Sequence, residues 1–416
     1  MRELAVAPDP FTLDTTQLVR MIHGRTIRTL KQPIINLREK RQIGYEALSR
    51  GIHPDSGGII SAETLFGSAR LNGLIPEIDK MCSDKAIATY VRNIDTDQML
   101  FVNFDVSALE DESAGGSWIL DKVAQLAVPP QAVAIEIVES RAPSDLALMR
   151  FVARHRQAGM KIVLDDFGTA HSNLDRLHML RPDIVKIDRH LVQGIAEDHY
   201  RRSIVESIIL LSEKVGALSL VEGVETIEDV LACVSLGVSL FQGFYFSEPV
   251  AADLDIDDQI NARVDLVFRK SVEMLQKQWA QNRNEVRSYE QIVAHFVDVI
   301  ARKGREGLDT ALANVMGDAV GVECAYIVDS EGIQVTRTHF HTEDGERFFN
   351  RTSDVATRGT NHFLKHYFLK MKTNGHQQSL TRPYVSMATG NLCRTMGQML
   401  QSSSGKVFYL FVDFNV

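Results

Sequence analysis

The sequence predicts an α/β protein in which a β/α barrel is followed by a smaller α+β domain. Seven short runs rich in Val, Ile, Leu or Phe occur in the first two-thirds of the chain, and each ends in an acidic residue, an amide or a lysine. Longer stretches with helical spacing separate these runs, which is typical of strands alternating with helices in a parallel array. After about residue 303 the pattern changes to β-runs paired by polar turns.

The composition is that of an ordinary globular protein, and it excludes several classes. The 416 residues suit two or three domains, and 44% of them are hydrophobic and 24% charged. The four cysteines are far apart, which argues against a disulfide framework or a thiolate zinc site and leads us to expect a cytoplasmic protein. We expect no membrane span, because no run of about 18 apolar residues occurs. A net charge of −9 offers no basic surface to long nucleic acids.

Changes in the pattern divide the chain into four parts. A polar stretch comes first, and the β/α pattern that follows it ends near Pro249. A long helical pattern then leads into the β-runs of the last hundred or so residues. We therefore expect an N-terminal extension, a barrel, a helical connector and a C-terminal domain over residues 1–15, 16–253, 254–302 and 303–416, respectively.

Apolar residues recur at helical spacing through the expected connector. One stripe comprises Ile260, Val264, Val267, Leu275 and Trp279, and a second, heptad-like stripe comprises Val286, Tyr289, Val293, Phe296 and Ile300. The simple interpretation is one or two amphipathic helices packed on a domain. The sharper interpretation is a connector that transmits rotation between two domains of a dimer.

The polar residues at the ends of the apolar runs predict a single site. In a closed barrel the carboxyl ends of the parallel strands converge on one face, where the chemistry is carried out. The residues expected there are Glu46, Asn103, Glu136, Asp165, Asp166, Lys186, Glu222 and Gln242. Oxygen ligands without histidine or cysteine suit hard divalent ions such as Mg²⁺ or Mn²⁺.

The adjacent Asp165 and Asp166 are the most informative part of this set. Buried carboxylates are costly unless they are paired, hydrogen-bonded or bound to metal. Because side chains alternate along a strand, both aspartates can address neighbouring metal positions only where the strand unwinds. Two ions about 3.5–4 Å apart can clamp the attacking and leaving oxygens in phosphodiester hydrolysis. Lys186 would then neutralise phosphate charge or position the attacking water.

Seven ordered motifs, over roughly residues 20–250, carry a family resemblance: YEALSR, VNFD, EIVE, DDFGTAHSNL, KID, EGVE and QGFYFSEP. Together they resemble the EAL-domain phosphodiesterases, which cleave the bacterial messenger cyclic di-GMP. The resemblance implies a modified TIM (β/α)8 barrel with one antiparallel strand. It also implies metal-dependent hydrolysis of cyclic di-GMP to linear pGpG, and a homodimer.

The resemblance assigns roles residue by residue. It implies two Mg²⁺ or Mn²⁺ ions, whose ligands match Glu46, Asn103, Glu136, Asp165, Asp166 and Glu222. The catalytic positions match Lys186, which orders the attacking water, together with Glu222 and Glu46. The substrate-binding positions match Gln32, Leu48, Arg50, Asp188 and Gln242. Glu139 matches the glutamate that anchors the loop following the aspartate pair.

The chain departs from the family pattern without losing a ligand. Ala170 and His171 stand where the family usually shows Gly and Tyr, and alanine tolerates positive φ poorly, so loop closure is affected. Phe104 and Asp105 replace the common Leu-Ser, and Val138 replaces a hydroxyl-bearing residue. These departures leave an alternative open, namely a catalytically silent receptor that binds cyclic di-GMP.

The C-terminal string RPYVSMATGNLCRTMGQMLQSSSGKVFYLFVDFN resembles the final strands of PAS-like, Cache-type sensor domains. The resemblance implies a regulatory α+β domain that binds an unknown small ligand, with candidate pocket residues Arg382, Tyr384, Thr389 and Asp413. The alternative is that these are hairpin and core positions of a dimerisation module. His339 and His341 alternate on one expected strand, where they could bind a metal or line an exposed face.

Overall fold

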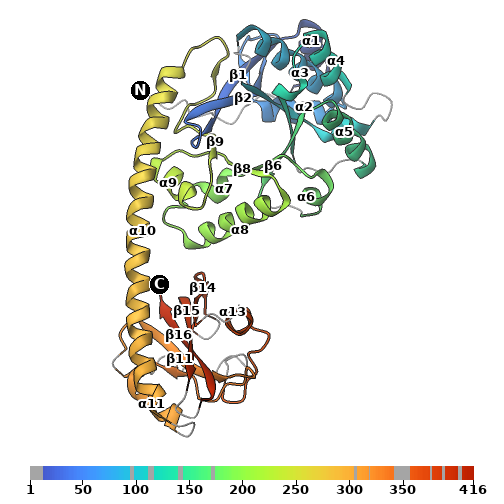
Figure 1. Cartoon of the computed structure of the whole chain (residues 1–416). Coiled ribbons are helices and arrows are strands. Elements are labelled where there is room, and N and C mark those ends of the chain that lie inside the picture. Colours follow the sequence, from blue (N-terminus) through green and yellow to red (C-terminus); the bar gives the residue numbers. More distant parts are fainter. Residues whose placement is uncertain are drawn as a thin grey trace. The chain divides into compact units, whose positions relative to one another are not determined.

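Two compact units make up the chain, Met1–Gln276 and Lys277–Val416 (Figure 1). The computed structural model describes residues 13–93, 98–110, 117–138, 144–169, 174–303, 307–317, 319–341, 357–374, 377–386, 389–401 and 405–416. Each unit has a hydrophobic core of its own. The finer four-part division expected from the sequence stays a prediction.

The first unit alternates strands with helices, as the apolar runs predict. Its elements are α1 (Thr15–Gly24), β1 (Ile27–Asn36), β2 (Arg41–Ile52), β3 (Ile59–Ile60), α2 (Ala62–Leu71), α3 (Ile75–Asn93), β4 (Met99–Phe104), α4 (Ser117–Gln125), β5 (Val133–Val138), α5 (Asp145–Gln157), β6 (Lys161–Phe167), α6 (Leu174–Leu180), β7 (Ile184–Ile187), α7 (Arg189–Val192), α8 (His199–Val215), β8 (Leu218–Val221), α9 (Ile227–Ser235), β9 (Leu240–Phe241) and β10 (Val250–Ala251). The long helix α10 (Asp257–Ala301) begins after β10.

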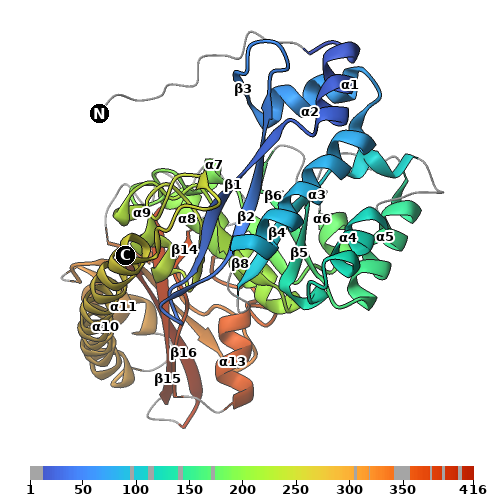
Figure 2. The same ribbon diagram turned by 90° about the horizontal axis from the view of Figure 1, so that it is seen from above.

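Eight strands close into a barrel, in the order β1, β9, β8, β7, β6, β5, β4 and β2, and β2 pairs back to β1. The strand β1 runs antiparallel to both β2 and β9, whereas the other neighbours in the ring are parallel. The antiparallel pair arises because β1 and β2 form a hairpin, whose turn contains Lys40 at φ 56°. Figure 2 shows α3, α4 and α5 along one side of these strands. The expected modified barrel is therefore confirmed.

The interior of the barrel is filled by one layer of apolar side chains. Its buried members are Ile34, Phe101, Ala134, Val163, Ile184, Leu220 and Leu240. The other faces of the strands pack with the surrounding helices in a larger core that includes Ile135, Ile162 and Val185. Since side chains alternate along a strand, the inward apolar layer fixes which neighbouring positions also point inward.

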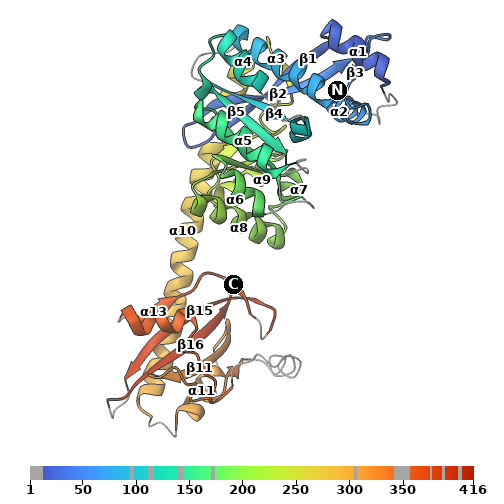
Figure 3. The same cartoon turned by 90° about the vertical axis from the view of Figure 1, so that its right-hand side faces the viewer.

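The second unit is built on a six-stranded antiparallel sheet. Its elements after α10 are α11 (Leu308–Met316), β11 (Val322–Asp329), β12 (His339–Phe340), α13 (His366–Asn374), β13 (Gln378–Leu380), β14 (Tyr384–Val385), β15 (Leu392–Gln401) and β16 (Val407–Asn415). The strand order is β12-β11-β16-β15-β13, and β14 pairs with β15. Figure 3 shows the three neighbouring strands β11, β16 and β15. A turn at Asp329–Gly332 follows β11, and the last strand, β16, is largely buried. The α+β class is confirmed, while the likeness to PAS domains stays a prediction.

Helix α10 buries residues near each of its ends. Ile260, Val264 and Val267 belong to the core of the first unit, whereas Tyr289 and Phe296 belong to that of the second. The interpretation that placed Trp279 on a buried stripe is wrong, because 73% of its surface is exposed. Among the helices in the described part of the chain, none is long and apolar enough to cross a membrane.

Candidate active site

The barrel gathers the polar strand-end residues through a simple register rule. On β4, β5, β6, β7, β8 and β9, one polar residue follows an inward apolar residue by two positions, as Glu136 follows Ala134 and Lys186 follows Ile184. On β2, Gly44 stands two positions before Glu46 in place of an apolar residue. The antiparallel β1 obeys the rule in reverse, because Gln32 precedes Ile34 by two positions and lies opposite Glu46 on β2. Alternation therefore turns these polar side chains inward at one end of the barrel.

Asp165 and Asp166 share this end because the strand is distorted between them. The pairing of β6 with β7 shifts register between Leu164 and Phe167. Asp166 adopts a left-handed backbone with φ 56°, and its N–H donates to Oδ1 of Asp165 at 2.9 Å. The expectation that the strand must unwind for both carboxylates to serve one site is confirmed.

Lys186 lies at the centre of the carboxylates. Its Nζ atom is 2.5 Å from Oε1 of Glu222, 2.8 Å from Oε1 of Glu136, 3.3 Å from Oδ1 of Asp165 and 3.5 Å from Oε2 of Glu46. The lysine side chain is only 1% exposed. A buried ammonium among four carboxylates compensates part of their charge and leaves a net negative site.

Glu46 is held by amide donors on both of its oxygens. Asn103 Nδ2 donates to Oε1 at 2.8 Å, and Gln242 Nε2 donates to Oε2 at 2.6 Å. Gln242 Nε2 also lies 3.0 Å from Oε1 of Gln32, whose own amide donates to the carbonyl of Ser247 at 3.1 Å. Together with the ion pairs of Lys186, these contacts join residues from all eight barrel strands in one hydrogen-bonded and ion-paired group.

Burial and mutual repulsion make this group hard to ionise completely. Burial, followed by the charge of Glu46, raises the pKa of Glu136 well above its ordinary value. Burial and then Asp165 raise the pKa of Asp166 to about 6. Burial also raises the pKa of Glu222. Although burial opposes ionisation of Glu46, the ammonium of Lys186 and the amide donors lower its pKa. Such a cluster favours bound cations.

The donor set fits divalent metal. Carboxylate oxygens of Asp165, Asp166 and Glu222 all lie within 4.8 Å of one another. Among the described residues, Oε2 of Glu136 is buried and has no hydrogen-bond partner. A buried carboxylate oxygen without a donor calls for a cation, and an all-oxygen set suits Mg²⁺, Mn²⁺ or Ca²⁺.

The remaining expected site residues lie around this group. Leu48 and Arg50 are half-buried on β2, and Arg50 Nη1 donates to the carbonyl of Ser49 at 2.9 Å. Asp188 caps α7, accepting the N–H of His190 at 2.8 Å. The predicted loop anchor Glu139, and the loop residues Ala170 and His171, lie outside the described residues.

A cavity of about 620 Å³ opens from the carboxylate rim towards α2 and α3. Glu46, Asn103, Asp165 and Asp166 form its wall at the rim. Its other lining residues are Ala47, Leu48, Ser49, Ala62, Glu63, Phe66, Arg70, Asp79, Cys82, Ser83, Ala86, Val102, Phe104 and Asp105. The residues from α2 and α3 were not predicted from the sequence, because single polar residues on an amphipathic helix resemble a solvated face.

The four candidate pocket residues of the second unit do not form one cluster. Tyr384 Oη donates to Oδ2 of buried Asp413 at 3.1 Å, and Thr389 donates to Glu323. Arg382 is exposed on the loop before β14. Burial raises the pKa of Asp413 to about 6. These contacts bring Tyr384 and Asp413 together.

The two histidines considered as metal ligands point to α11 instead. His339 Nε2 is 2.8 Å from Oδ1 of Asp309, and His341 Nδ1 is 2.9 Å from the carbonyl of Met316. Both histidines are half-buried, so an exposed strand face does not describe them.

The barrel, its rim of oxygen ligands and its central lysine define the class of protein, and the comparisons agree. The EAL domain model matches residues 15–249, more than half of the chain. The chain therefore belongs to the EAL domain family.

Two relatives illustrate the likeness. The uncharacterised EAL-domain containing protein YkuI of Bacillus subtilis is 25% identical over 391 residues, 92% of each chain. The cyclic di-GMP phosphodiesterase RocR of Pseudomonas aeruginosa is 27% identical over 254 residues, which are 60% of this chain and 63% of RocR. The crystal structure of YkuI, in complex with cyclic di-GMP and calcium, matches with a TM-score of 0.79 at 23% identity and covers 97% of this chain and 99% of YkuI. This structural match establishes a shared fold.

Proposed function

We propose that this protein hydrolyses cyclic di-GMP to linear pGpG with a water activated by divalent metal. The observation that carries the proposal is the convergence of Glu46, Glu136, Asp165 and Glu222 on Lys186. Membership of the EAL family, and the named activity of its relative RocR, supply the substrate and the reaction class. A net negative, oxygen-rich pocket suits a phosphate ester only when cations are present.

Two Mg²⁺ or Mn²⁺ ions would be held by the oxygens of Glu46, Asn103, Glu136, Asp165, Asp166 and Glu222. Bound there, the ions would supply Lewis acidity to the phosphate and a nucleophilic water at neutral pH. This assignment is supported by the carboxylate trio within 4.8 Å and by the unpartnered oxygen of Glu136.

The other residues would orient the reacting groups. Lys186 would hold the attacking water and, as a fixed positive charge, stabilise the developing negative charge on the phosphate. Gln242 and Asn103 fix the rotamer of Glu46 through their amide donors. Gln32, Leu48, Arg50 and Asp188 would contact the nucleotide.

The test is incubation of purified protein with cyclic di-GMP and Mg²⁺ or Mn²⁺, followed by chromatography of the product. Appearance of pGpG, and its loss in the presence of a chelator, is expected. Absence of pGpG with either metal, while cyclic di-GMP binds, would instead establish the catalytically silent receptor.

The second unit would regulate the barrel and bind a small ligand. Support comes from the hydrogen bond between exposed Tyr384 and buried Asp413, which offers a carboxylate with a raised pKa on a sheet face. A screen of small cationic and neutral metabolites by thermal shift tests this role; loss of every shift in Asp413→Asn is expected. We propose a homodimer as well, to be measured by sedimentation. The cytoplasmic location stays a prediction.

A further inference from the structure

The cavity beside the carboxylate rim contains one basic side chain among acidic, neutral polar and apolar lining residues. Among the described residues that line it, Arg70 is the only arginine or lysine. Phe66, Ala86 and Val102 provide apolar wall, which suits the faces of a purine ring. Since the rim already holds the proposed metal ligands, the part near α2 and α3 is left for the portion of the substrate next to the reacting phosphate.

Arg70 is held in place by a fixed carboxylate. Its Nη2 atom donates to Oδ2 of Asp105 at 2.6 Å. Oδ1 of Asp105 accepts from the backbone N–H of Ser107 at 3.0 Å and from its hydroxyl at 2.6 Å. The backbone N–H of Asp105 in turn donates to Oδ1 of Asp79, a residue that is 1% exposed.

This arrangement leaves further guanidinium donors available. The carboxylate of Asp105 is 11% exposed, whereas 57% of the Arg70 side chain is accessible. An arginine has five N–H donors in a rigid plane, and the ion pair with Asp105 uses one nitrogen. Because both oxygens of Asp105 are bonded, the guanidinium has a fixed orientation before a ligand arrives.

We propose that Arg70 recognises a guanine base of the substrate, with Asp105 as its positioning residue. The inference rests on the proposed function and names the group that selects guanine over adenine. Guanine presents two adjacent acceptors, O6 and N7, that match two guanidinium N–H groups. Adenine replaces the O6 acceptor with an amino donor, which faces an arginine donor unfavourably. Asp105, which stands where the family commonly has Ser, therefore acts through Arg70.

The experiment compares cyclic di-GMP with cyclic di-AMP for the wild type, Arg70→Met, Arg70→Lys and Asp105→Asn. We expect Arg70→Met to raise KM for cyclic di-GMP on the order of tenfold with little change in kcat, and to reduce the preference for guanine by a similar factor. Arg70→Lys should lie between, since an ammonium lacks the planar pair of donors. Asp105→Asn should raise KM by a smaller factor.

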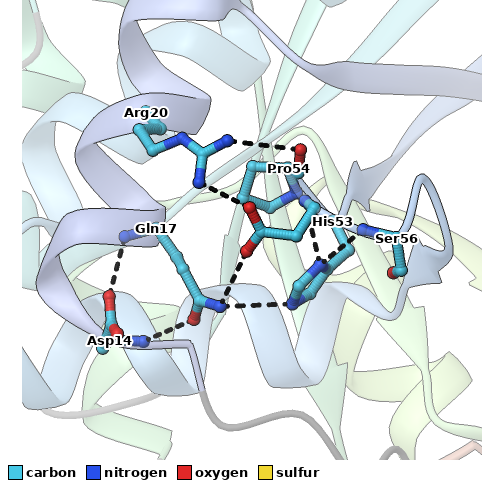
Figure 4. Close-up of polar contacts among 7 residues, drawn as sticks. Asp14, Gln17, Arg20, His53, Pro54 and Ser56 are labelled. Carbon is cyan, nitrogen blue, oxygen red and sulfur yellow. Dashed lines mark hydrogen bonds and ion pairs between the residues drawn. The ribbon is translucent and has the colours of Figure 1, made fainter.

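A surface ion pair elsewhere in the same unit provides the matched control. Arg20 Nη1, in the group of polar contacts drawn in Figure 4, donates to Oδ1 of Asp55 at 2.6 Å, and both side chains are about half exposed. Neither residue lines the cavity. Arg20→Met should leave KM, kcat and the guanine preference unchanged. Circular dichroism of all variants checks that they fold.

The outcomes separate this inference from the proposed function. Hydrolysis by the wild type with an unchanged KM and guanine preference in folded Arg70→Met would overturn the role of Arg70 and leave the phosphodiesterase activity standing. If the wild type forms no pGpG, the affinities for cyclic di-GMP and cyclic di-AMP, measured by calorimetry with Ca²⁺ present, report the preference for guanine instead. Equal affinity for both dinucleotides, or no binding of either, would also overturn the inference.

Discussion

The Nζ atom of Lys186 lies 2.8 Å from Oε1 of Glu136, and the two side chains are 1% and 0% exposed. Glu136 depends on Lys186 for compensation of its charge, because water reaches neither side chain, whereas Lys186 also contacts three other carboxylates. Removing one partner of a buried ion pair typically costs about 3–5 kcal/mol, since the remaining charge is left uncompensated. The pair links the stability of the barrel to the chemistry at its rim.

Replacement of Lys186 by Met should therefore destabilise the protein and abolish turnover. We expect the free energy of unfolding to fall by about 3–5 kcal/mol in a chelator. Part of this loss should be recovered with Mn²⁺, because cations replace the missing positive charge. Denaturant unfolding under both conditions measures the effect.

The surface ion pair of Lys161 and Asp183, with Nζ 3.0 Å from Oδ1, serves as the control. Lys161→Met should change the free energy of unfolding by less than about 1 kcal/mol. An equal loss for Lys186→Met with and without Mn²⁺ would contradict the idea that metal and lysine compensate the same charges.

The substitution Glu46→Gln tests a metal ligand without removing volume. Asn103 and Gln242 donate to different oxygens of Glu46, and a glutamine side chain offers only one oxygen, so one donor would face an amide N–H₂. We expect turnover to fall at least about 100-fold and the metal concentration at half-saturation to rise. Product formation across a Mn²⁺ titration gives both quantities.

The matched variant is Glu39→Gln in the exposed β1–β2 turn, where Glu39 bonds Arg41 at 2.7 Å. It should turn over cyclic di-GMP like the wild type. Full activity in Glu46→Gln would rule out a ligand role for Glu46.

Asp166 should make metal binding depend on pH. Burial and the charge of Asp165 raise its pKa to about 6. Between about pH 4 and 6 the unfolded chain loses this proton first, so the free energy of unfolding of the metal-free protein should fall as pH rises. Metal must displace the same proton, so the affinity for Mn²⁺ should rise with pH through this window.

Calorimetric titration with Mn²⁺ at several pH values measures this slope. Asp166→Asn has no proton to release, so its slope should be shallower. The slope should not vanish, because burial raises the pKa of Glu136 and Glu222 as well. An unchanged slope in Asp166→Asn would show that other groups account for the proton release.

The barrel and its rim could be predicted from the sequence, because both depend on local patterns: strands that alternate with helices, and side chains that alternate along each strand. The spacing of Ala134 and Glu136, two positions apart in one apolar run, can be read directly from the sequence and predicts that both side chains lie on the same face of the strand. The left-handed backbone of Asp166 followed only indirectly, from the requirement that two adjacent carboxylates share one site. That inference needed the motif and a chemical reason together.

The wall of the cavity could not be anticipated in the same way. Arg70 and Asp105 lie 35 residues apart, and their ion pair depends on how α2 packs beside the end of β4. Periodicity reports which face of a helix is apolar, but it does not report which polar residue a neighbouring loop will meet. Trp279 shows the converse error, since its helical spacing suggested burial where the chain leaves it exposed.

Two aromatic residues of helix α10 should differ strongly in what they contribute to stability. Phe296 is 1% exposed within the core of the second unit, whereas Trp279 is 73% exposed. Phe296→Ala should lower the free energy of unfolding of this unit by about 3–5 kcal/mol, because it leaves a cavity in a closely packed core. Trp279→Ala should change it by no more than about 0.5 kcal/mol. Scanning calorimetry of the full chain measures both; a comparable loss in Trp279→Ala would mean that another surface covers the tryptophan in solution.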